Sequence, residues 1–391
     1  MTAPRSRPKD RKATIVTAAA ELFADRGFAT VGIDEIGARV GVTGPAIYRH
    51  FPNKEALLVA VLEQMLEGFV ENVEESARMS GGDLAAVVSA SVQHILDHSA
   101  YSVTYLRERR SPVVGVPASR VRSAERRIRR GWLAVERTVL PDIDPLRGRL
   151  RQYAIVGAVA AAARDHKNVA RPRLDELLIA SAIAVASFPM VVQSAESKQA
   201  KRTKQRWQAG PSKQEEILSA ALRLFRERGV NGVGIDEVGA AAGISGPTIY
   251  HYFESKSAIV LEAYDRAGER VAVGTHEALR SATSAEDALD RLIASYVAVA
   301  ADNVDLIVVT SRESDCLPEF ELARLSRRRR TIRDGWAAAL GQIRPDLTEP
   351  ETRLLVRTVF PLVNQAVEAA EGQDGLRPEI VALAGAHFRS K

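Results

Sequence analysis

The chain has 391 residues, 46% of them hydrophobic and 26% charged, a composition typical of globular proteins and unlike that of disordered or fibrous chains. This length exceeds an ordinary single core and suits two domains of about 150–200 residues each. The net charge is only +5, and the single cysteine, Cys316, excludes an intramolecular disulfide and fits a reducing cytoplasm. The apolar runs at 154–163 and 177–192 are too short or too interrupted to cross a bilayer, so we expect a cytoplasmic protein with no membrane partner.

The first predicted elements are four helices in close succession. Gly27 ends the first helix and Gly41 the second, since glycine readily takes the left-handed conformation that follows a helix. Pro45 stands in the first turn of a third helix, where proline is tolerated, and Asn53 can cap a fourth. The inner stripe of that fourth helix is Leu58, Leu62, Met65, Phe69 and Val73. No segment alternates convincingly at period two, so we predict an all-α fold without a sheet.

The same pattern returns about 200 residues later. Aligning Ile15 with Ile217 gives a gapless match through Ala60 and Glu262, with 22 identities in 46 positions. Weaker similarity continues through "RRIRRGW" and "RTIRDGW", and the offset drifts only from 202 to 205. A repeat of this length is a whole domain that was copied and fused, because solenoid units are far shorter.

The most distinctive repeated phrase is "GVTGPAIYRHF" at 41–51 and "GISGPTIYHYF" at 243–253. Two short helices joined by a glycine turn form a helix-turn-helix, whose second helix enters the DNA major groove. Ile47 and Phe51 would anchor that helix, small residues on its leading edge can approach a thymine methyl, and polar residues on its flanks can bond phosphates. The candidate DNA-binding residues are Thr43, Gly44, Pro45, Ala46, Tyr48, Arg49, His50 and Lys54, and in the second copy Ser245, Gly246, Pro247, Thr248, Tyr250, His251, Tyr252 and Lys256.

A second interpretation treats Tyr48 and Tyr250 as core aromatics and the nearby cations as an ordinary solvated surface. The duplication argues against it, because both copies keep Gly-Pro-x-Ile-Tyr and a lysine while the surrounding surface diverges. Basic runs also precede both copies, at 5–12 and 198–206. Either run alone is explained by a solvated linker, but the two together favour an anionic polymer as the partner.

Residues 11–60 and 213–262 resemble the DNA-binding domain of the tetracycline-repressor (TetR) family. The resemblance rests on Phe-x-x-x-Gly followed by Tyr-x-x-Phe-x-x-Lys, matched by "LFADRGF…YRHFPNK" and "LFRERGV…YHYFESK". One departure is that Gly32 and Gly234 replace the threonine that often caps the second helix; glycine is an acceptable cap but lacks the hydroxyl for one phosphate contact. The resemblance implies that double-stranded operator DNA is contacted by Thr43, Tyr48, His50 and Lys54, with Ser245, Tyr250, Tyr252 and Lys256.

The resemblance also implies two tandem TetR-like units, each a helix-turn-helix domain followed by a helical ligand and dimerisation domain. The predicted segments are 9–58 and 59–193 in the first unit, a basic linker at 194–212, and 213–262 and 263–391 in the second unit. Such a tandem pair resembles the doubled TetR regulators of actinobacteria that control mammalian-cell-entry and lipid-utilisation operons. This implies a bacterial, nucleoid-associated repressor that a small lipid-like effector, such as an acyl-coenzyme A or a steroid-derived compound, releases from DNA.

Two other classes of function remain as alternatives. An enzyme is disfavoured, because the chain lacks metalloprotease, Walker, nucleophile-elbow and dinucleotide motifs and its seven histidines show no paired metal spacing. We therefore expect no catalytic residue, metal site or cofactor. A constitutive architectural DNA-binding protein without an effector is the second alternative, and it predicts ligand domains without cavities.

Repeated polar motifs in the two ligand domains supply candidate effector-binding residues. The Arg-Glu pairs at 107–108 and 312–313 can either line a pocket or form interhelical salt bridges, and we favour the bridge. An Arg-x-x-Trp motif in each half places a cation and an indole on one helix face, which suits an anionic head group or packing at a domain seam. The candidates are Arg107, Arg129, Trp132, Arg312, Arg333 and Trp336.

TetR-family subunits dimerise through their last two helices. The corresponding segments here are 149–166, 173–188, 353–370 and 376–388. The first pair is rich in alanine and the second is bulkier, so small residues could face large ones. Because a covalently linked partner has an effective concentration on the order of millimolar, we predict an intramolecular four-helix bundle and a monomeric chain that acts as a pseudo-dimer. Its unlike recognition residues predict an imperfectly palindromic operator.

Overall fold

The computed structural model describes residues 8–108, 118–165, 168–189, 212–313, 316–370 and 373–390. Within these ranges the protein is all-helical, as predicted, and contains no strand. Only Ser212 of the predicted linker 194–212 is described, where it caps the following helix. The second basic run, 198–206, lies outside the described residues.

Each helix of the first half has a counterpart nine places later in the order of elements. The first half contains α1 (Pro8–Arg26), α2 (Ile33–Arg39), α3 (Gly44–Ile47), α4 (Lys54–Ser80), α5 (Leu84–Asp97), α6 (Ser99–Glu108), α7 (Ala118–Val139), α8 (Pro145–Arg164) and α9 (Arg171–Ser187). The second half contains α10 (Lys213–Arg228), α11 (Ile235–Ala241), α12 (Gly246–Ile249), α13 (Lys256–Ser281), α14 (Ala285–Asp302), α15 (Val304–Arg312), α16 (Glu319–Ile343), α17 (Glu349–Ala369) and α18 (Arg377–Arg389). A 3-10 turn, Asp374–Leu376, precedes α18.

The helix ends follow the glycines and the cap that the sequence indicated. Gly27 and Gly41 have φ of 81° and 70°, and their counterparts Gly229 and Gly243 have 71° and 69°, a region that other residues rarely adopt. The side chain of Asn53 caps α4 by accepting a backbone N–H at 2.7 Å. The predicted domain boundaries after 58 and 262 fall inside α4 and α13, so one continuous helix joins each DNA-binding domain to its ligand domain.

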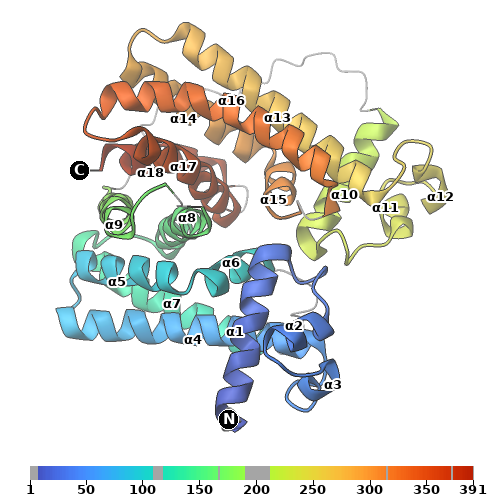
Figure 1. Ribbon diagram of the computed structural model, residues 1–391. Helices are drawn as coiled ribbons and strands as arrows, with labels where there is room; N and C mark the ends of the chain where they lie inside the picture. The colour runs from blue at the N-terminus through green and yellow to red at the C-terminus, as the bar shows by residue number, and fades with distance from the viewer. Residues whose placement is uncertain are drawn as a thin grey trace.

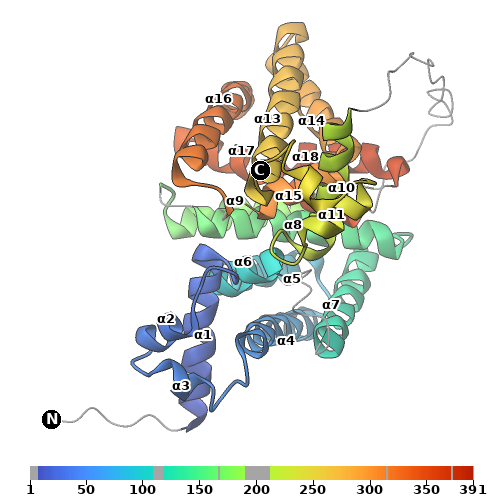
Figure 2. The same cartoon turned by 90° about the vertical axis from the view of Figure 1, so that its right-hand side faces the viewer.

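The apolar side chains form two separate cores. One cluster runs without interruption from the first DNA-binding domain through the first ligand domain and into α14, α17 and α18 of the second half. The other holds α10 to α12 together with the start of α13 and parts of α15 and α16. Figures 1 and 2 show the two DNA-binding domains at separate places, with α1–α3 at the bottom and α10–α12 higher up. Most of both ligand domains therefore share one core with α1–α3, whereas α10–α12 have a core of their own with parts of α13, α15 and α16.

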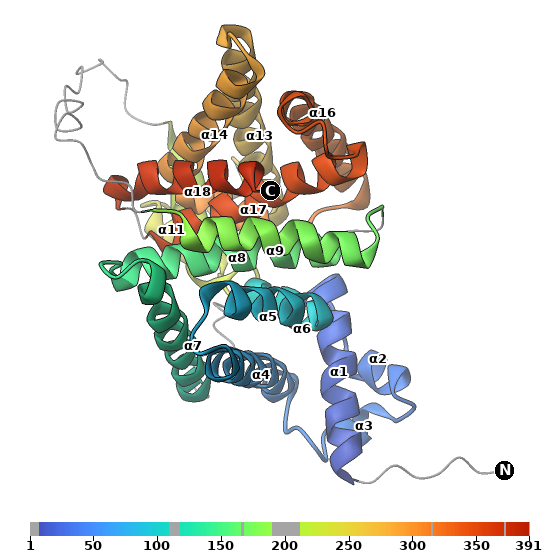
Figure 3. The same cartoon turned by 90° about the vertical axis from the view of Figure 1, so that its left-hand side faces the viewer.

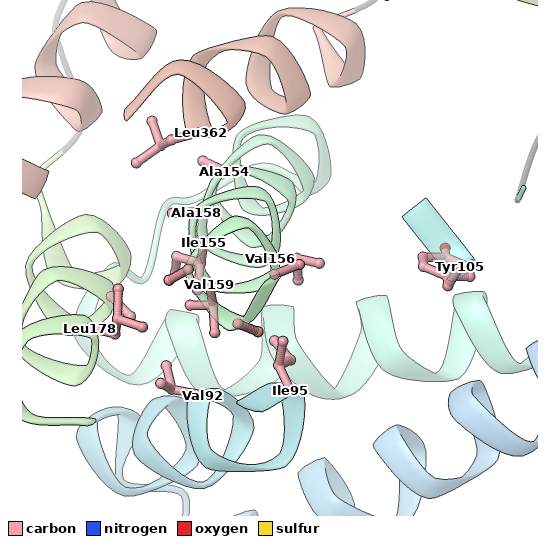
Figure 4. Close-up of a cluster of buried hydrophobic side chains, with 14 of the residues drawn as sticks. Val92, Ile95, Tyr105, Ala154, Ile155, Val156, Ala158, Val159, Leu178 and Leu362 are labelled. Carbon is pink, nitrogen blue, oxygen red and sulfur yellow. The ribbon is translucent and has the colours of Figure 1, made fainter. Parts of the chain in front are cut away.

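The two halves meet along α8 and α17, which pack closely, and along α9 and α18, which lie side by side in Figure 3. Leu362 of α17 lies over Ala154 of α8, above the core of the first half (Figure 4). The approach is closest at Gly157, where a Cβ atom would stand 2.7 Å from the carbonyl oxygen of Pro361. A residue without a side chain is required there because nothing larger fits against the backbone of α17.

Polar side chains also cross this seam. Arg151 of α8 is fully buried and donates to the carboxylate of Glu379 on α18. Arg173 donates to Glu351 at 2.6 Å. His387 is buried between a hydroxyl from each half, Ser181 and Thr358, and burial lowers its pKa to about 4. The seam therefore has specific polar contacts in addition to apolar packing.

Among the described helices, no single one is long and apolar enough to cross a membrane. The helices α14 and α15 meet that test only together, as a pair bent by 96°. Their apolar residues belong to the two cores.

Candidate nucleic-acid interface and effector cavities

The helix-turn-helix is built on a turn in which two backbones nearly touch. At Gly37 of α2 a Cβ atom would stand 2.7 Å from the carbonyl oxygen of Val42, and at Gly239 of α11 it would stand 2.8 Å from the amide of Gly246. Ile47 is fully buried and Phe51 nearly so. These apolar anchors hold α3 against the domain, as predicted, and leave its other faces to solvent.

Most of the predicted recognition residues lie on the surface. Tyr48 and Tyr250 are 52% and 55% exposed, so the interpretation that treats them as core aromatics is wrong. The other exposed candidates are Thr43, Pro45, Arg49, Ser245, Pro247, His251 and Tyr252, while Ala46, His50 and Thr248 are half-buried. In the second copy the hydroxyls of Ser245 and Thr248 are hydrogen bonded at 2.7 Å.

Gly44 and Gly246 do not lie on the leading edge where the sequence analysis placed them. Both are buried, and a Cβ atom would stand 2.0 Å from a carboxylate oxygen of Asp34 at the first and 1.9 Å from that of Asp236 at the second. They are glycines because the start of α3 and of α12 packs directly on the preceding helix. Their role is in the fold of the motif, and their exposed neighbours remain the predicted base-contacting residues.

The predicted phosphate-binding lysines also face inward. The ammonium of Lys54 lies 3.5 Å from the carbonyl oxygen of Ala29 and 4.3 Å from the centre of the Phe28 ring. Lys256 donates to the carbonyl oxygens of Val230 and Val233, both at 2.8 Å. Burial lowers the pKa of Lys54. Each lysine thus ties the start of the long helix α4 or α13 to the loop that follows α1 or α10.

Two glutamates that sequence reasoning did not select hold the same loops from the other side. Glu108, at the end of α6, accepts the backbone N–H of Phe28 at 3.2 Å, and Glu313, after α15, accepts that of Val230. Burial raises the pKa of both carboxyls. Each glutamate therefore links the end of α6 or α15 to the loop that follows α1 or α10. The signal was present in the sequence as the repeated Arg-Glu pairs.

The arginines of those pairs lie where the two halves meet. A cavity of about 390 Å³ is lined by Arg107, Glu108, Arg312 and Glu313 and by the loops after α1 and α10. Arg312 forms an interhelical ion pair with Glu368 of α17, with contacts of 2.5 and 2.6 Å, and burial lowers the pKa of Arg107. Both alternatives from the sequence therefore apply, since the pairs line a pocket and one of the arginines forms a bridge.

Each ligand domain also has its own cavity, and the two differ greatly in size. A cavity of about 240 Å³ lies among α13 to α17 of the second half, with Arg164 of α8 at its edge, and is also lined by Tyr264, Tyr296, Phe360 and Arg333. In the first half the corresponding space is about 30 Å³ and is lined by Arg129, which is room for about one water molecule. Of the predicted effector residues outside the Arg-Glu pairs, only the two arginines reach a ligand-domain cavity.

The tryptophans of the Arg-x-x-Trp motifs lie in the core. Trp132 and Trp336 are 2% and 1% exposed and line neither ligand-domain cavity. The ring of Trp336 packs against Phe360 at 5.1 Å and edge-on against Tyr296 at 6.3 Å. Both indoles thus lie in the apolar core, away from these two cavities, and Trp336 packs on aromatic side chains of its own half.

The profile of a family described as bacterial regulatory proteins, tetR family, matches this chain twice, at residues 15–61 and 217–263. Residues 15–61 and 217–263 are therefore two tetR-type segments within one chain. Both matches cover the helix-turn-helix, and their separation reflects the tandem duplication that the sequence repeat predicted.

Curated relatives match the tetR-type chain over limited stretches. It is 40% identical over 72 residues to the HTH-type transcriptional activator FasR of Mycolicibacterium smegmatis, covering 18% of this chain and 33% of that protein. It is 31% identical over 111 residues to the fatty acid metabolism regulator protein of Bacillus subtilis, covering 27% of this chain and 56% of that protein. The matches thus span about a third to just over half of these relatives. A solved TetR-family regulator from Bordetella parapertussis has a TM-score of 0.42 and 20% identity, covering 45% of this chain and 93% of that one.

Proposed function

We propose that this protein is a sequence-specific DNA-binding transcriptional regulator that works as a single-chain pseudo-dimer under the control of a small molecule. The observation that supports it most strongly is the pair of helix-turn-helix motifs with exposed, unlike recognition residues. In Figure 1 both motifs, α2–α3 and α11–α12, lie on the right-hand side of the molecule. Repression, predicted from the sequence, follows wherever the operator overlaps a promoter.

The pseudo-dimer is supported by the contacts between halves. The helices α8, α9, α17 and α18 are the counterparts of those that pair two subunits in the family, and here they pair within one chain. The two helix-turn-helix motifs present different side chains to DNA, for instance Arg49 and His50 in the first and His251 and Tyr252 in the second. The expected operator has two unlike half-sites about one helical turn apart.

Control by an effector is supported by the cavity in the second ligand domain. A cavity of about 240 Å³ gives a small molecule a place to bind, whereas a constitutive architectural protein was expected to have ligand domains without cavities. A lipid-derived effector is supported by the similarity to the fatty acid metabolism regulator protein of Bacillus subtilis. No step of this function needs a metal or a catalytic residue, and it places the protein on DNA in the bacterial cytoplasm.

The proposal is tested by selecting an operator from random DNA with the full chain, and then measuring binding by fluorescence anisotropy. Tyr48→Ala and Tyr250→Ala should each weaken binding to one half-site about tenfold, which is the loss of one contact worth roughly 1.4 kcal/mol. Phe320→Ala is the control, because Phe320 is 70% exposed and lies on α16. Equal affinity for the tyrosine variants and the wild type would refute the docking.

Light scattering of the complex tests the pseudo-dimer separately. One chain per operator is the expected stoichiometry. Two chains bound to a symmetric site would show that the halves do not replace two subunits.

A further inference from the structure

The two ligand-domain cavities are lined by matching positions of the duplicated sequence. With the offsets of 202 to 205 that align the halves, large residues around the first cavity correspond to small ones around the second. Met65, Phe69 and Tyr105 line the first cavity. Their counterparts Ala267, Val271 and Thr310 line the second. At these three positions the smaller side chains of the second half agree with its larger cavity, about 240 Å³ against about 30 Å³, whereas Val156 of the first cavity corresponds to the larger Phe360 of the second.

The charge at these positions has changed as well. Glu125 in the first cavity accepts a hydrogen bond from the hydroxyl of Tyr105 at 2.7 Å, and its counterpart in the second half is Arg329. Gly268 makes room for another arginine, because a Cβ atom there would stand 2.9 Å from the guanidinium of Arg328. The first cavity is nearly filled and has one carboxylate, Glu125, beside one guanidinium, Arg129, whereas the second is larger and has several guanidinium groups.

The second cavity continues into a cationic bay on the surface of α16 and α17. The bay has a volume of about 270 Å³ and shares Arg329 and Arg333 with the cavity. Arg353 and Arg357 contribute to it and are held by ion pairs with Asp334 and Asp165, both at 2.9 Å. The arginines that line the cavity and the bay are Arg164, Arg328, Arg329, Arg330, Arg333, Arg353 and Arg357. Among the described residues, Asp165 is the one carboxylate that lines either space.

Three aromatic side chains and four arginines line the cavity itself. Tyr264, Tyr296 and Phe360 line it, and the guanidinium of Arg333 lies 5.7 Å from the centre of the Phe360 ring. Burial, together with the neighbouring Arg329 and Arg357, lowers the pKa of Arg333 to about 10. An anion at Arg333 would relieve this crowding of positive charge. An apolar body thus fits inside, and negative charge fits at the mouth.

We propose that the chain has one effector site in its ligand domains, in the second half, and that this site takes a compound with a short apolar body and a multiply charged phosphate-bearing head. The body occupies the aromatic cavity, which holds about eight water-sized groups of about 30 Å³ each, and the head lies on the arginine bay. The first-half copy is a filled, structural remnant. This inference rests on the proposed function, because the bound compound is an effector only if the protein is a ligand-controlled DNA-binding regulator.

The route from this site to DNA is short. Thr310 and Ser311 of α15 line the cavity, and Glu313 at the end of the same helix holds the loop of the second DNA-binding domain. Occupancy by a ligand therefore acts first on α10–α12. The first DNA-binding domain receives the change through the α8–α17 seam.

Isothermal titration calorimetry of the full chain with octanoyl-coenzyme A tests this site without DNA. We expect one ligand per chain and at least tenfold weaker binding of octanoate alone and of coenzyme A alone. Arg333→Gln and Val271→Phe should each weaken binding at least tenfold, the second because it restores the residue type of the filled copy. Arg129→Gln is the matched control, since Arg129 lines the first cavity, and it should leave affinity within twofold of wild type.

Four results would overturn the inference: two ligands per chain, equal losses in Arg129→Gln and Arg333→Gln, octanoate binding as tightly as octanoyl-coenzyme A, or no binding of any of the three probes. Circular dichroism of each variant checks that it folds. Fluorescence anisotropy with operator DNA, measured on the same proteins, distinguishes a failure of the ligand-site proposal from a failure of the proposed DNA-binding function. A chain that binds one octanoyl-coenzyme A but no operator leaves the site intact and refutes the DNA-binding proposal, and the converse result refutes only the site.

Discussion

Replacing Arg151 by methionine should destabilise the protein at the seam between its halves. Arg151 donates to Glu379 of the other half and to the carbonyl oxygens of Ala186 and Phe188, at 3.2 and 2.7 Å, at the end of α9. Both charged side chains are buried. Removing the guanidinium leaves a carboxylate in a place that water does not reach.

The expected loss can be worked from these contacts. Breaking a buried ion pair by removing one partner costs about 3–5 kcal/mol. Here Arg147 lies 4.0 Å from the other carboxylate oxygen of Glu379 and compensates for part of the lost charge, so the lower end, about 3 kcal/mol, applies. The double change Arg151→Met with Glu379→Met removes both charges and should recover at least about 1 kcal/mol of that loss, because apolar pairs of similar volume replace buried ion pairs well.

Guanidinium chloride unfolding followed by circular dichroism measures the free energy of unfolding of the wild type and the single and double variants. Arg151→Met should also bind the operator more weakly, since the seam between the halves sets the distance between the two DNA-binding domains. A loss below about 1 kcal/mol in the single variant, or a double variant less stable than the single one, would refute the reasoning that a buried charge is what the seam protects.

Two further predictions concern the neighbouring helices. Burial raises the pKa of Glu136 to about 8 from an ordinary 4.5, so the folded state holds a proton that the unfolded state releases. The free energy of unfolding should therefore fall as pH rises from about 4.5 to 8, by up to about 1.4 kcal/mol per pH unit, and Glu136→Gln should abolish that slope in denaturation at stepped pH. Gly157→Ala should cost about 1–3 kcal/mol because its Cβ meets the α17 backbone, whereas Gly341→Ala, with open space around it, should stabilise α16 by up to about 1 kcal/mol; equal effects of the two changes in thermal unfolding would contradict the tight crossing.

The helix-turn-helix could be predicted from sequence because its determinants are local. Positive-φ glycines, a proline in a first turn and an Asn cap act within a few residues of where they stand, so Gly27, Gly41 and Asn53 could be assigned from the sequence alone. The seam was also visible, because the alanine-rich segment of α8 indicated a backbone that comes close to its neighbour.

The roles of Lys54 and Gly44 could not be predicted in this way. Whether a lysine at a helix start faces a phosphate or the carbonyl oxygens of a loop depends on where that loop folds, and the loop is 25 residues away in the chain. Likewise Gly44 is glycine because Asp34 lies against it, a contact between two helices. The cavities depend on five helices at once, so the exchange of Phe69 for Val271 gains its meaning only when the two halves are superposed in space.

The crossing of Gly157 with Pro361 also bears on how such a protein can change over generations. The two residues occupy equivalent places in the duplicated sequence, at an offset of 204. In a dimer of identical subunits each mutation appears on both sides of the axis, so a glycine there faces a glycine and a proline faces a proline. Fusion into one reading frame removed that constraint. One gene now encodes both sides of the contact, so the two residues can differ and are inherited together. A chain that carries its own partner is also shielded from mixing with subunits of related regulators in the same cell, so its two halves were free to specialise together.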